Sequence, residues 1–394
     1  MKIVHVLTRF LRAGSEENTV ATSLWQAAQG HDVVIVHGCD YDRSWYRELD
    51  GQVEIRAMPD LVHALSPVQD AIAIYRFRNL LRELRPDVVH THQSKAGIVG
   101  RAAAIGLPGV LVVHGLHIVN FDVDSRWKRA FYIAVERLSA RWTDCFIAVS
   151  QSVADRYSEI GVCTSDNTDV VYSGMDLERF ASAVPPDDYD TLLGPGFVGN
   201  NRPSVVLMLA AFEPRKRHVP FLEALAERRT RFPEFRLLLA GTGPTEDEAM
   251  QLAQRLELDD VVVFCGHRPD PERLVAGADV CVLTSDREGL PRVAVQALAG
   301  GKPFVATELP GLTEILTDGR NAIVTGPDVM EAVQALAEVL SDAKSRERLA
   351  SGARNTDLSR WSLEALGRCT TEIYVDAMKT RQVVRPIRQW FARN

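Results

Sequence analysis

The stretch Leu283–Pro303, which reads LTSDREGLPRVAVQALAGGKP, decides the fold of the second half of the chain. An apolar run ends at Leu283, and a polar loop carrying Glu288 follows it. Pro291 suits the first position of a helix, and Gly300-Gly301 suits its end. The stretch therefore predicts a strand, a loop and a helix. Glu288 would lie just before the helix N-terminus, where an anion also binds.

The same alternation extends over the whole chain. Short runs rich in Val and Ile recur between segments of helical periodicity, which is typical of a parallel sheet covered on both faces. The apolar runs lie at 3–7, 33–37, 88–90, 110–113, 145–149 and 170–172, and then at 205–210, 236–240, 261–265, 279–283 and 303–306. Helices are expected at 71–84, 126–140, 220–227, 246–256, 271–276 and 291–299.

The two series of runs are separated by residues 181–203, which are dense in Pro, Gly, Asp and Asn. A chain of 394 residues suits two domains better than one. We therefore expect α/β domains at 1–180 and 204–372, each a doubly wound parallel sheet of the Rossmann type. Ligands of such sheets bind beyond the C-terminal ends of the strands, so a shared ligand would lie in a cleft that both domains face.

Composition excludes several classes of protein. The formal net charge is −7, whereas proteins that bind nucleic acid usually carry a basic excess. The six cysteines form no C-x-x-C pair, which favours a reducing compartment. The opening MKIVHVLTRF reads as a strand and not as a signal peptide, and no apolar run is long enough for a membrane span. We expect a soluble, cytoplasmic protein.

Two further motifs follow strands of the second domain and suit phosphate. Gly241-Thr242-Gly243 would let the backbone approach a ligand closely, and Arg215 with Lys216 would supply cations to a diphosphate. Taken alone, the first also fits a tight turn and the second a solvated basic loop. No complete G-x-G-x-x-G is present, which argues against a nicotinamide or flavin enzyme.

Together these motifs resemble the C-terminal half of the family 4 retaining glycosyltransferases of the GT-B fold, also called glycosyl transferases group 1. The matching segments are Lys216, Gly241–Gly243, Phe264–Gly266, Ala278–Val280, Ser285–Pro291, Gly301–Thr307 and Gly311–Glu314. The first half is similar to the same family at Ala13–Glu16, His90–His92, Ser94–Gly97, His114-Gly115 and Ser173–Asp176. The resemblance thus covers most of the chain.

The resemblance implies a role for each of these positions. Lys216 and Arg215 would bind the diphosphate of a UDP- or GDP-sugar donor, and Glu288 would contact its sugar. Gln296 would contact the ribose, and His114 would lie at the reacting face. Backbone groups at Gly14, Gly241, Gly243, Gly289 and Leu290 would approach the donor. The family also suggests that a C-terminal helix at about 373–394 packs back on the first domain.

The implied reaction is transfer of the sugar, with retention of configuration, to a hydroxyl of a glycan, a lipid-linked sugar or a small molecule. No D-x-D motif stands in a suitable loop, so we expect neither a metal nor another cofactor. Two departures keep alternatives open, because the family has Glu at the position of Gln296 and Arg at that of Ala211. The alternatives are a degenerate GT-B binding subunit and a GT-B phosphorylase or epimerase.

Two smaller signals remain. We expect His90 and His92 to face opposite sides of their strand, so that at most one points into the binding cleft. The segment 75–85 alternates arginines with apolar residues. It is either a face for a membrane surface or an ordinary amphipathic helix with a basic outer side.

Overall fold

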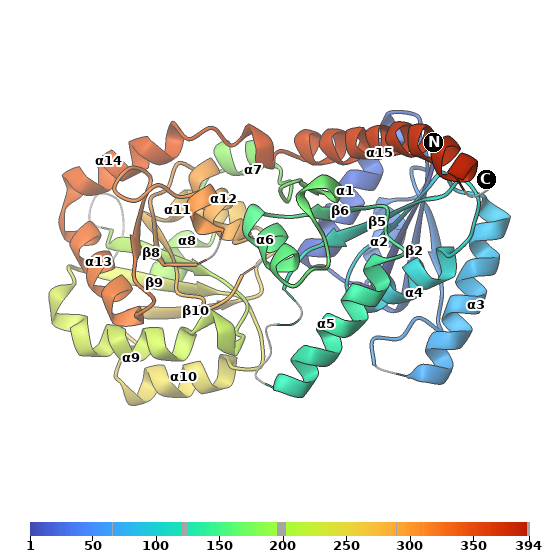
Figure 1. Ribbon diagram of the computed structural model, residues 1–394. Coiled ribbons are helices and arrows are strands. Elements are labelled where there is room, and N and C mark those ends of the chain that lie inside the picture. The colour runs from blue at the N-terminus through green and yellow to red at the C-terminus, as the bar shows by residue number, and fades with distance from the viewer. Residues whose placement is uncertain are drawn as a thin grey trace. The chain divides into compact units, whose positions relative to one another are not determined.

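The computed structural model describes residues 1–64, 66–119, 121, 125–194, 202–288, 290–309 and 311–391, with side chains up to residue 380. These residues form two compact units (Figure 1). Unit 1 comprises Met1–Gly174 with Arg360–Asn394, and unit 2 comprises Met175–Ser359. Each unit holds one parallel sheet with helices on its faces, which confirms the predicted fold class of two Rossmann-like domains.

The sheet of unit 1 has seven strands in the order β3-β2-β1-β4-β5-β6-β7. Its central strands are buried along most of their length, as their largely apolar sequences require. The strands are β1 (Lys2–Phe10), β2 (Asp32–Tyr41), β3 (Glu54–Ala57), β4 (Val88–Thr91), β5 (Leu111–Leu116), β6 (Cys145–Ala148) and β7 (Thr168–Val170). The helices are α1 (Gly14–Ala28), α2 (Ser44–Glu48), α3 (Pro67–Leu84), α4 (Ser94–Ala104), α5 (Arg126–Ala140), α6 (Gln151–Glu159) and α15 (Leu363–Phe391).

The sheet of unit 2 has six strands in the order β10-β9-β8-β11-β12-β13. The strands are β8 (Ser204–Leu209), β9 (Phe235–Ala240), β10 (Val262–Gly266), β11 (Val280–Leu283), β12 (Phe304–Thr307) and β13 (Ala322–Thr325). The helices are α7 (Leu177–Ala181), α8 (Tyr189–Leu193), α9 (His218–Arg228), α10 (Glu246–Arg255), α11 (Pro271–Gly277), α12 (Arg292–Ala299), α13 (Val329–Ser341) and α14 (Ala343–Arg354). A short 3₁₀ helix, η3 (Pro214–Lys216), follows β8.

Both strand orders reverse direction at one point, which is called the topological switch point of the sheet. In unit 1 the chain winds outward from β1 to β3 and then returns to place β4 on the other side of β1. In unit 2 the same reversal places β11 beside β8. Loops leaving two such neighbouring strands diverge, and the gap between them is where doubly wound sheets bind ligands. The loops after β1, β4, β8 and β11 are therefore the ones that matter for function.

The division between the units differs from the predicted linker at 181–203. The chain passes into unit 2 at Gly174–Met175, because α7 packs on α11 and α12 and Arg179 pairs with Glu272 at 2.7 Å. Part of the expected linker is also helical: the hydroxyl of Tyr189 in α8 donates a hydrogen bond to the carbonyl of Gly277. The chain leaves unit 2 at Ser359, earlier than the predicted 372.

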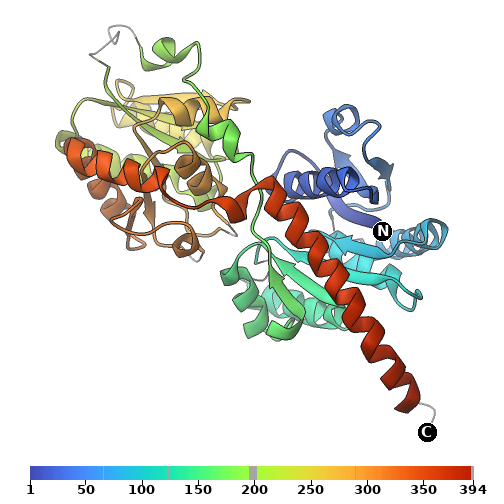
Figure 2. The same cartoon turned by 90° about the horizontal axis from the view of Figure 1, so that it is seen from above.

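The C-terminal helix α15 belongs to unit 1 and lies beside α1 (Figure 2). It begins at Leu363, ten residues before the expected start at 373. Gly367 permits the close approach, because a Cβ at that position would lie 2.3 Å from Cγ of Trp25 in α1. Farther along, Tyr374 is completely buried in a cluster that includes Ile3 and Val88. The helix thus covers the sheet near the switch point of unit 1.

Candidate functional site

The switch point of unit 2 brings together three of the predicted site residues. Arg215 and Lys216 lie on η3 after β8, and Glu288 lies on the loop between β11 and α12. The Lys216 ammonium donates to Oε1 of Glu288, and Nη1 of Arg215 donates to Oε2 at 2.9 Å. The side chains of Glu288 and Lys216 are only 9% and 12% exposed. The carboxylate is therefore held between two cations in a largely desolvated setting.

The backbones of the two loops are joined as well. The amide of Asp286 donates to the carbonyl of Arg215 at 2.9 Å, and Nη1 of Arg215 donates to the carbonyl of Arg287 at 3.2 Å. Glu213 adds a second carboxylate, which accepts from Nε of Arg215 at 2.6 Å. Burial disfavours the charge on Arg215, but the two carboxylates outweigh it and raise the pKa of the guanidinium.

Sequence reasoning missed two neighbours of this site. Arg217 has φ 60° and ψ 37°, a left-handed conformation that costs a residue with a side chain about 1–2 kcal/mol. It ends η3 and starts α9, so the chain turns there directly after Lys216. His218 is 2% exposed, and its ring stacks on Phe212 with neither nitrogen hydrogen-bonded to any residue that the structure describes. Burial, helped by the charge of Lys216, lowers the pKa of His218 to about 4.

Gly241 and Gly243 hold the end of β9 against the segment that leads to the cations. A Cβ on Gly241 would lie 2.1 Å from the carbonyl oxygen of Ala210, and one on Gly243 would lie 2.5 Å from that of Phe212. The amide of Phe212 donates to the carbonyl of Thr242 at 3.0 Å. The structure thus gives both glycines a packing reason, a close approach of two backbones, beside the predicted role toward the donor.

Helix α12 supplies the remaining predicted residues of unit 2. Leu290 is buried, and its carbonyl accepts a hydrogen bond from the amide of Arg292 at 2.9 Å. Pro291 at the N-cap has no side-chain acceptor, and the amide of Ala294 in the first turn donates to the carbonyl of Pro291 at 2.9 Å. Gln296 is half-buried on the second turn of the helix. Gly289 lies outside the described residues.

The switch point of unit 1 holds Gly14. This residue starts α1, and Ala13 at the N-cap provides no side-chain acceptor for the first amides of the helix. Gln93, from the loop after β4, ties the two loops together: its Oε1 accepts from the amides of Thr8 and Arg9 at 3.0 and 3.1 Å. The positive φ of Gln93, 61°, is strained for a residue with a side chain. Sequence reasoning did not single it out.

His114 lies inside unit 1 and is 2% exposed. On β5 its Nδ1 is 2.8 Å from Oγ1 of Thr91, and its Cε1 would be 2.5 Å from a Cβ on Gly97. Burial, followed by the charge of Arg101, lowers the pKa of His114 well below its usual value. The ring is therefore neutral at pH 7 and packed against α4. His117, three residues farther on, is the next histidine after the same strand.

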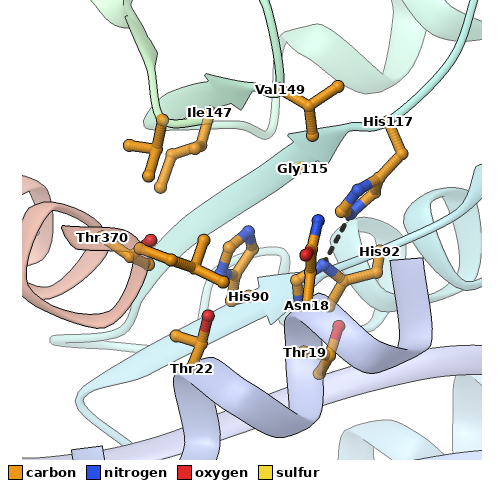
Figure 3. Close-up of a pocket in the computed structure, with 12 residues that line it drawn as sticks. Asn18, Thr19, Thr22, His90, His92, Gly115, His117, Ile147, Val149 and Thr370 are labelled. Carbon is orange, nitrogen blue, oxygen red and sulfur yellow. Dashed lines mark hydrogen bonds between the residues drawn. The ribbon is translucent and has the colours of Figure 1, made fainter. Parts of the chain in front are cut away.

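The expectation that His90 and His92 face opposite sides is wrong. Residues two apart along a strand share a face, and both rings line one small cavity with His117 (Figure 3). The two ring centroids are 4.0 Å apart.

The basic side of the segment 75–85 is largely engaged within unit 1. Arg76 pairs with Asp60, and Nη1 of Arg78 donates to the carbonyls of Ala103 and Ile105 at 2.8 and 2.6 Å. A different helix, α5, carries exposed aromatic residues: Trp127 is 88% and Phe131 52% exposed. Within the part of the chain that the structure describes, no helix is long and apolar enough to cross a bilayer.

Two sequence families match the chain, one in each unit. Residues 13–174 match the family described as glycosyl transferase 4-like domain, and residues 197–356 match the family described as glycosyl transferases group 1. The second match contains Arg215, Lys216 and Glu288.

Individual proteins show the same relationship. The D-inositol 3-phosphate glycosyltransferase of a Nocardioides strain is 30% identical over 315 residues, which are 73% of this chain and 67% of that protein. The UDP-Gal:α-D-GlcNAc-diphosphoundecaprenol α-1,3-galactosyltransferase of Escherichia coli is 25% identical over 83% of this chain and 85% of its own length. The crystal structure of HepE from Anabaena in complex with UDP has a TM-score of 0.79 at 22% identity, covering 95% of this chain and 100% of HepE.

Proposed function

The chain belongs to the group 1 glycosyltransferases of the GT-B fold, and on that premise we propose that it moves a sugar from a UDP- or GDP-sugar to a hydroxyl with retention of configuration. The acceptor is a glycan, a lipid-linked sugar or a small molecule, and the product belongs to polysaccharide or glycoconjugate biosynthesis. Two relatives support this range of acceptors: one is named as a galactosyltransferase for a GlcNAc-diphosphoundecaprenol, and the other as a glycosyltransferase of lipopolysaccharide core biosynthesis.

The observation that carries the proposal is the contact of Glu288 with Arg215 and Lys216 at the switch point of unit 2. A nucleotide diphosphate needs cations, and these two converge from one loop, next to the uncapped start of α12. The hydroxyls of a hexose need a hydrogen-bond acceptor that is fixed in place. The carboxylate of Glu288 is such an acceptor because its two cations hold it. The arrangement suits a ligand with a diphosphate and a sugar at adjacent ends.

The chemistry follows from where charge develops. Cleavage of the bond between the sugar and the diphosphate leaves negative charge on the departing phosphate oxygens, while the anomeric carbon becomes positive. Lys216 and Arg215 stabilise the departing charge because they are already in place before the reaction. The incoming hydroxyl forms the new bond to the anomeric carbon, and its proton leaves with the diphosphate. We expect no metal ion at the diphosphate and no other cofactor.

The other predicted residues keep their proposed roles. Gln296 contacts the ribose through its amide, the backbone around Gly14 and Leu290 approaches the donor, and His114 acts at the reacting face. Because Nδ1 of His114 is engaged by Thr91, its Nε2 is the atom that would meet the donor sugar.

Donor binding by the purified chain tests the proposal. UDP-, GDP-, ADP- and TDP-sugars are each titrated into the chain by calorimetry, and the corresponding free nucleotides are titrated in parallel. Slow hydrolysis of each donor is then followed in the presence and in the absence of Mg²⁺. We expect one donor to bind and to be hydrolysed at the same rate in both conditions. Lys216→Met should lower the affinity for both the sugar nucleotide and the free nucleotide by at least about tenfold, or 1.4 kcal/mol. Glu288→Gln should lower the affinity for the sugar nucleotide more than the affinity for the free nucleotide.

The controls replace exposed residues of the same type in unit 2. Lys344→Met and Glu248→Gln should bind like the parent chain. If no nucleotide sugar binds, the proposal fails. If one binds but is neither hydrolysed nor transferred, the chain is a binding subunit, as Gln296 and Ala211 would then explain.

We further propose that unit 1 contacts an anionic membrane surface at the cytoplasmic face through α5. Trp127, Phe131 and Leu138 are spaced to share one face of this helix, and all three are exposed. Its first turn contains the exposed basic residues Arg126, Lys128 and Arg129 and no acidic residue. Aromatic residues beside cations are the pattern of helices that lie in the interface of a bilayer. A lipid-linked acceptor would be met at that surface.

A further inference from the structure

Four histidines of unit 1 meet beneath its switch point, although they come from separate parts of the chain. His5 lies on β1 and His90 on β4, whereas His92 and His117 follow β4 and β5. His5, His90 and His92 are each less than 5% exposed. Parallel pairing sets His5 beside His90 in register, so their side chains leave the same face of the sheet. None of these four has a part in the proposed donor chemistry.

The tautomer of His5 follows from its neighbours. Oγ1 of Thr371 donates to the carbonyl of Gly367 at 2.8 Å and therefore accepts from Nε2 of Gln26 at 3.2 Å. That fixes the amide of Gln26, whose Oε1 faces Nε2 of His5 at 2.9 Å. The ring must donate there, because the amide oxygen is only an acceptor. Nδ1 of His5 therefore carries a lone pair, and this atom faces His92.

His90 and His92 are held in the same manner by one ring nitrogen each. Nδ1 of His90 is 2.5 Å from the hydroxyl of Tyr374, and its Nε2 is buried without a hydrogen-bond partner among the described residues. Nδ1 of His92 is 3.0 Å from Nε2 of His117, which leaves Nε2 of His92 directed at Nδ1 of His5, also at 3.0 Å. Each of the three rings thus has one nitrogen engaged by a residue other than the three, namely Gln26, Tyr374 or His117.

The three rings lie close to one another. One ring nitrogen from each of His5, His90 and His92 lies within 4.8 Å of those of the other two. A cavity of about 30 Å³ is lined by two of these histidines, His90 and His92, together with His117 and Asn18 (Figure 3). Oδ1 of Asn18 is also buried without a partner. The cavity is large enough for one water molecule, and its wall carries polar atoms that would bind one.

We propose that His5, His90 and His92 form a binding site for one divalent transition-metal ion, with Zn²⁺ as the principal candidate. Three imidazoles and one water are a common ligand set for zinc in proteins. Because the site offers nitrogen and no carboxylate, it selects against Mg²⁺ and Ca²⁺, which prefer oxygen. The water would occupy the cavity against Asn18. This inference goes beyond the proposed transfer reaction and is independent of the donor site in unit 2.

Binding a metal requires the three ring nitrogens, which now lie within 4.8 Å of one another, to reach the separations of a tetrahedral site. Zinc binds imidazole nitrogen at roughly 2.0–2.1 Å, so two tetrahedral ligands lie ~3.3 Å apart. The nitrogens of His5 and His92 that now share a proton are 3.0 Å apart, so they must separate by a few tenths of an ångström. The partners that the other nitrogens already have, Gln26 and Tyr374 among them, are the kind that orient metal-binding histidines.

The protonation states also suit a metal. Burial lowers the pKa of His5 to about 4 and keeps those of His90 and His92 well below the usual value. All three rings are therefore neutral at pH 7, which is the form that binds metal. Binding would tie β1 to β4 at the edge of the sheet from which Gly14 and Gln93 extend.

Metal binding by the purified chain tests the inference without measuring activity. The chain is dialysed against a chelator and titrated with Zn²⁺ in competition with a chromophoric chelator. Co²⁺ is then added to a separate sample to record its visible absorption. We expect one ion per chain and a Co²⁺ spectrum typical of a four-coordinate nitrogen site. His90→Gln and His92→Gln should each lower the Zn²⁺ affinity by at least 100-fold, and Tyr374→Phe by about 10–100-fold.

His63→Gln is the matched control, because this histidine is exposed and lies outside the cluster. It should bind Zn²⁺ like the parent chain. If the parent binds no Zn²⁺, or if His90→Gln and His92→Gln bind as tightly as His63→Gln, the inference is wrong. Circular dichroism checks the folding of each variant. Should both ligand variants fail to fold, the parent chain decides: Zn²⁺ must raise its unfolding midpoint while Mg²⁺ does not.

Discussion

Lys216 and Glu288 form an ion pair across 72 residues of sequence and thereby join the loops that leave β8 and β11. The pair is nearly buried, and Arg215 binds the second oxygen of the same carboxylate. Removing one member leaves a desolvated charge with fewer partners. The free-energy cost of that charge exceeds the net stabilisation that the intact pair provides.

We predict that Lys216→Met and Glu288→Gln each lower the free energy of unfolding of unit 2 by about 2 kcal/mol. Urea unfolding of each variant measures this, and the exposed control Glu248→Gln should stay within ~0.5 kcal/mol of the parent. In a double-mutant cycle the two changes should not add, because they remove the same contact. Additive effects would show that the two side chains have no coupling energy and that only backbone contacts hold the two loops together.

Arg217 gives a prediction about backbone strain. Its left-handed conformation, with φ 60°, disfavours any residue with a Cβ. We predict that Arg217→Gly is more stable than Arg217→Ala by about 1 kcal/mol, since both lose the guanidinium and only glycine avoids the steric cost. At the exposed helical position Arg348 in α14 the order should reverse, because glycine weakens a helix interior. The unfolding midpoints of the four variants test this prediction. If glycine and alanine rank in the same order at both positions, the backbone of Arg217 is not strained.

The central strands were predictable because burial on both faces demands continuous apolar runs, and those at 3–7 and 205–210 fall within β1 and within one residue of β8. The edge strands β3 and β13 were missed. β3 is mostly exposed, so its sequence, Glu54–Ala57, has no apolar pattern to read.

The site was predictable only in part. Motif order pointed to Arg215, Lys216 and Glu288, and the structure places them in contact. The left-handed backbone of Arg217 and the unpartnered ring of His218 have no signature in the sequence, because both depend on how η3 packs against the end of β9. The histidine cluster was likewise missed, since its members are brought together by strand register and by the return of α15.

The histidine cluster predicts a pH dependence of unit 1. Burial lowers the pKa of His5 and His117 to about 4 in the folded chain, whereas each titrates near 6.5 when unfolded. The unfolded chain therefore binds more protons between these values. The stability that these two rings contribute is complete above pH 6.5 and is lost as the pH drops from 6.5 to about 4.

We expect a loss of about 1.4 kcal/mol per pH unit for each such histidine inside this window. Urea unfolding at pH 7.5, 6.0 and 5.0 measures the slope. His117→Gln should reduce the slope by about that amount, while His63→Gln leaves it unchanged. A slope that His117→Gln does not alter would mean that the ring is protonated in the folded chain.

The exposed face of α5 gives the last prediction, which concerns where unit 1 meets a membrane. Sedimentation with vesicles of mixed anionic and neutral lipid should carry the chain down, and purely neutral vesicles should carry less, because the cations of the first turn require opposite charge. Trp127→Ala with Phe131→Ala should lower the bound fraction severalfold. Tyr75→Ala on α3 is the matched variant, since Tyr75 is also an exposed aromatic residue, at 67%, but its helix uses Arg76 and Arg78 within the unit. We expect it to bind like the parent. If Tyr75→Ala loses binding and the α5 variant does not, the contact lies on α3. If neither loses binding, no membrane face exists on these helices.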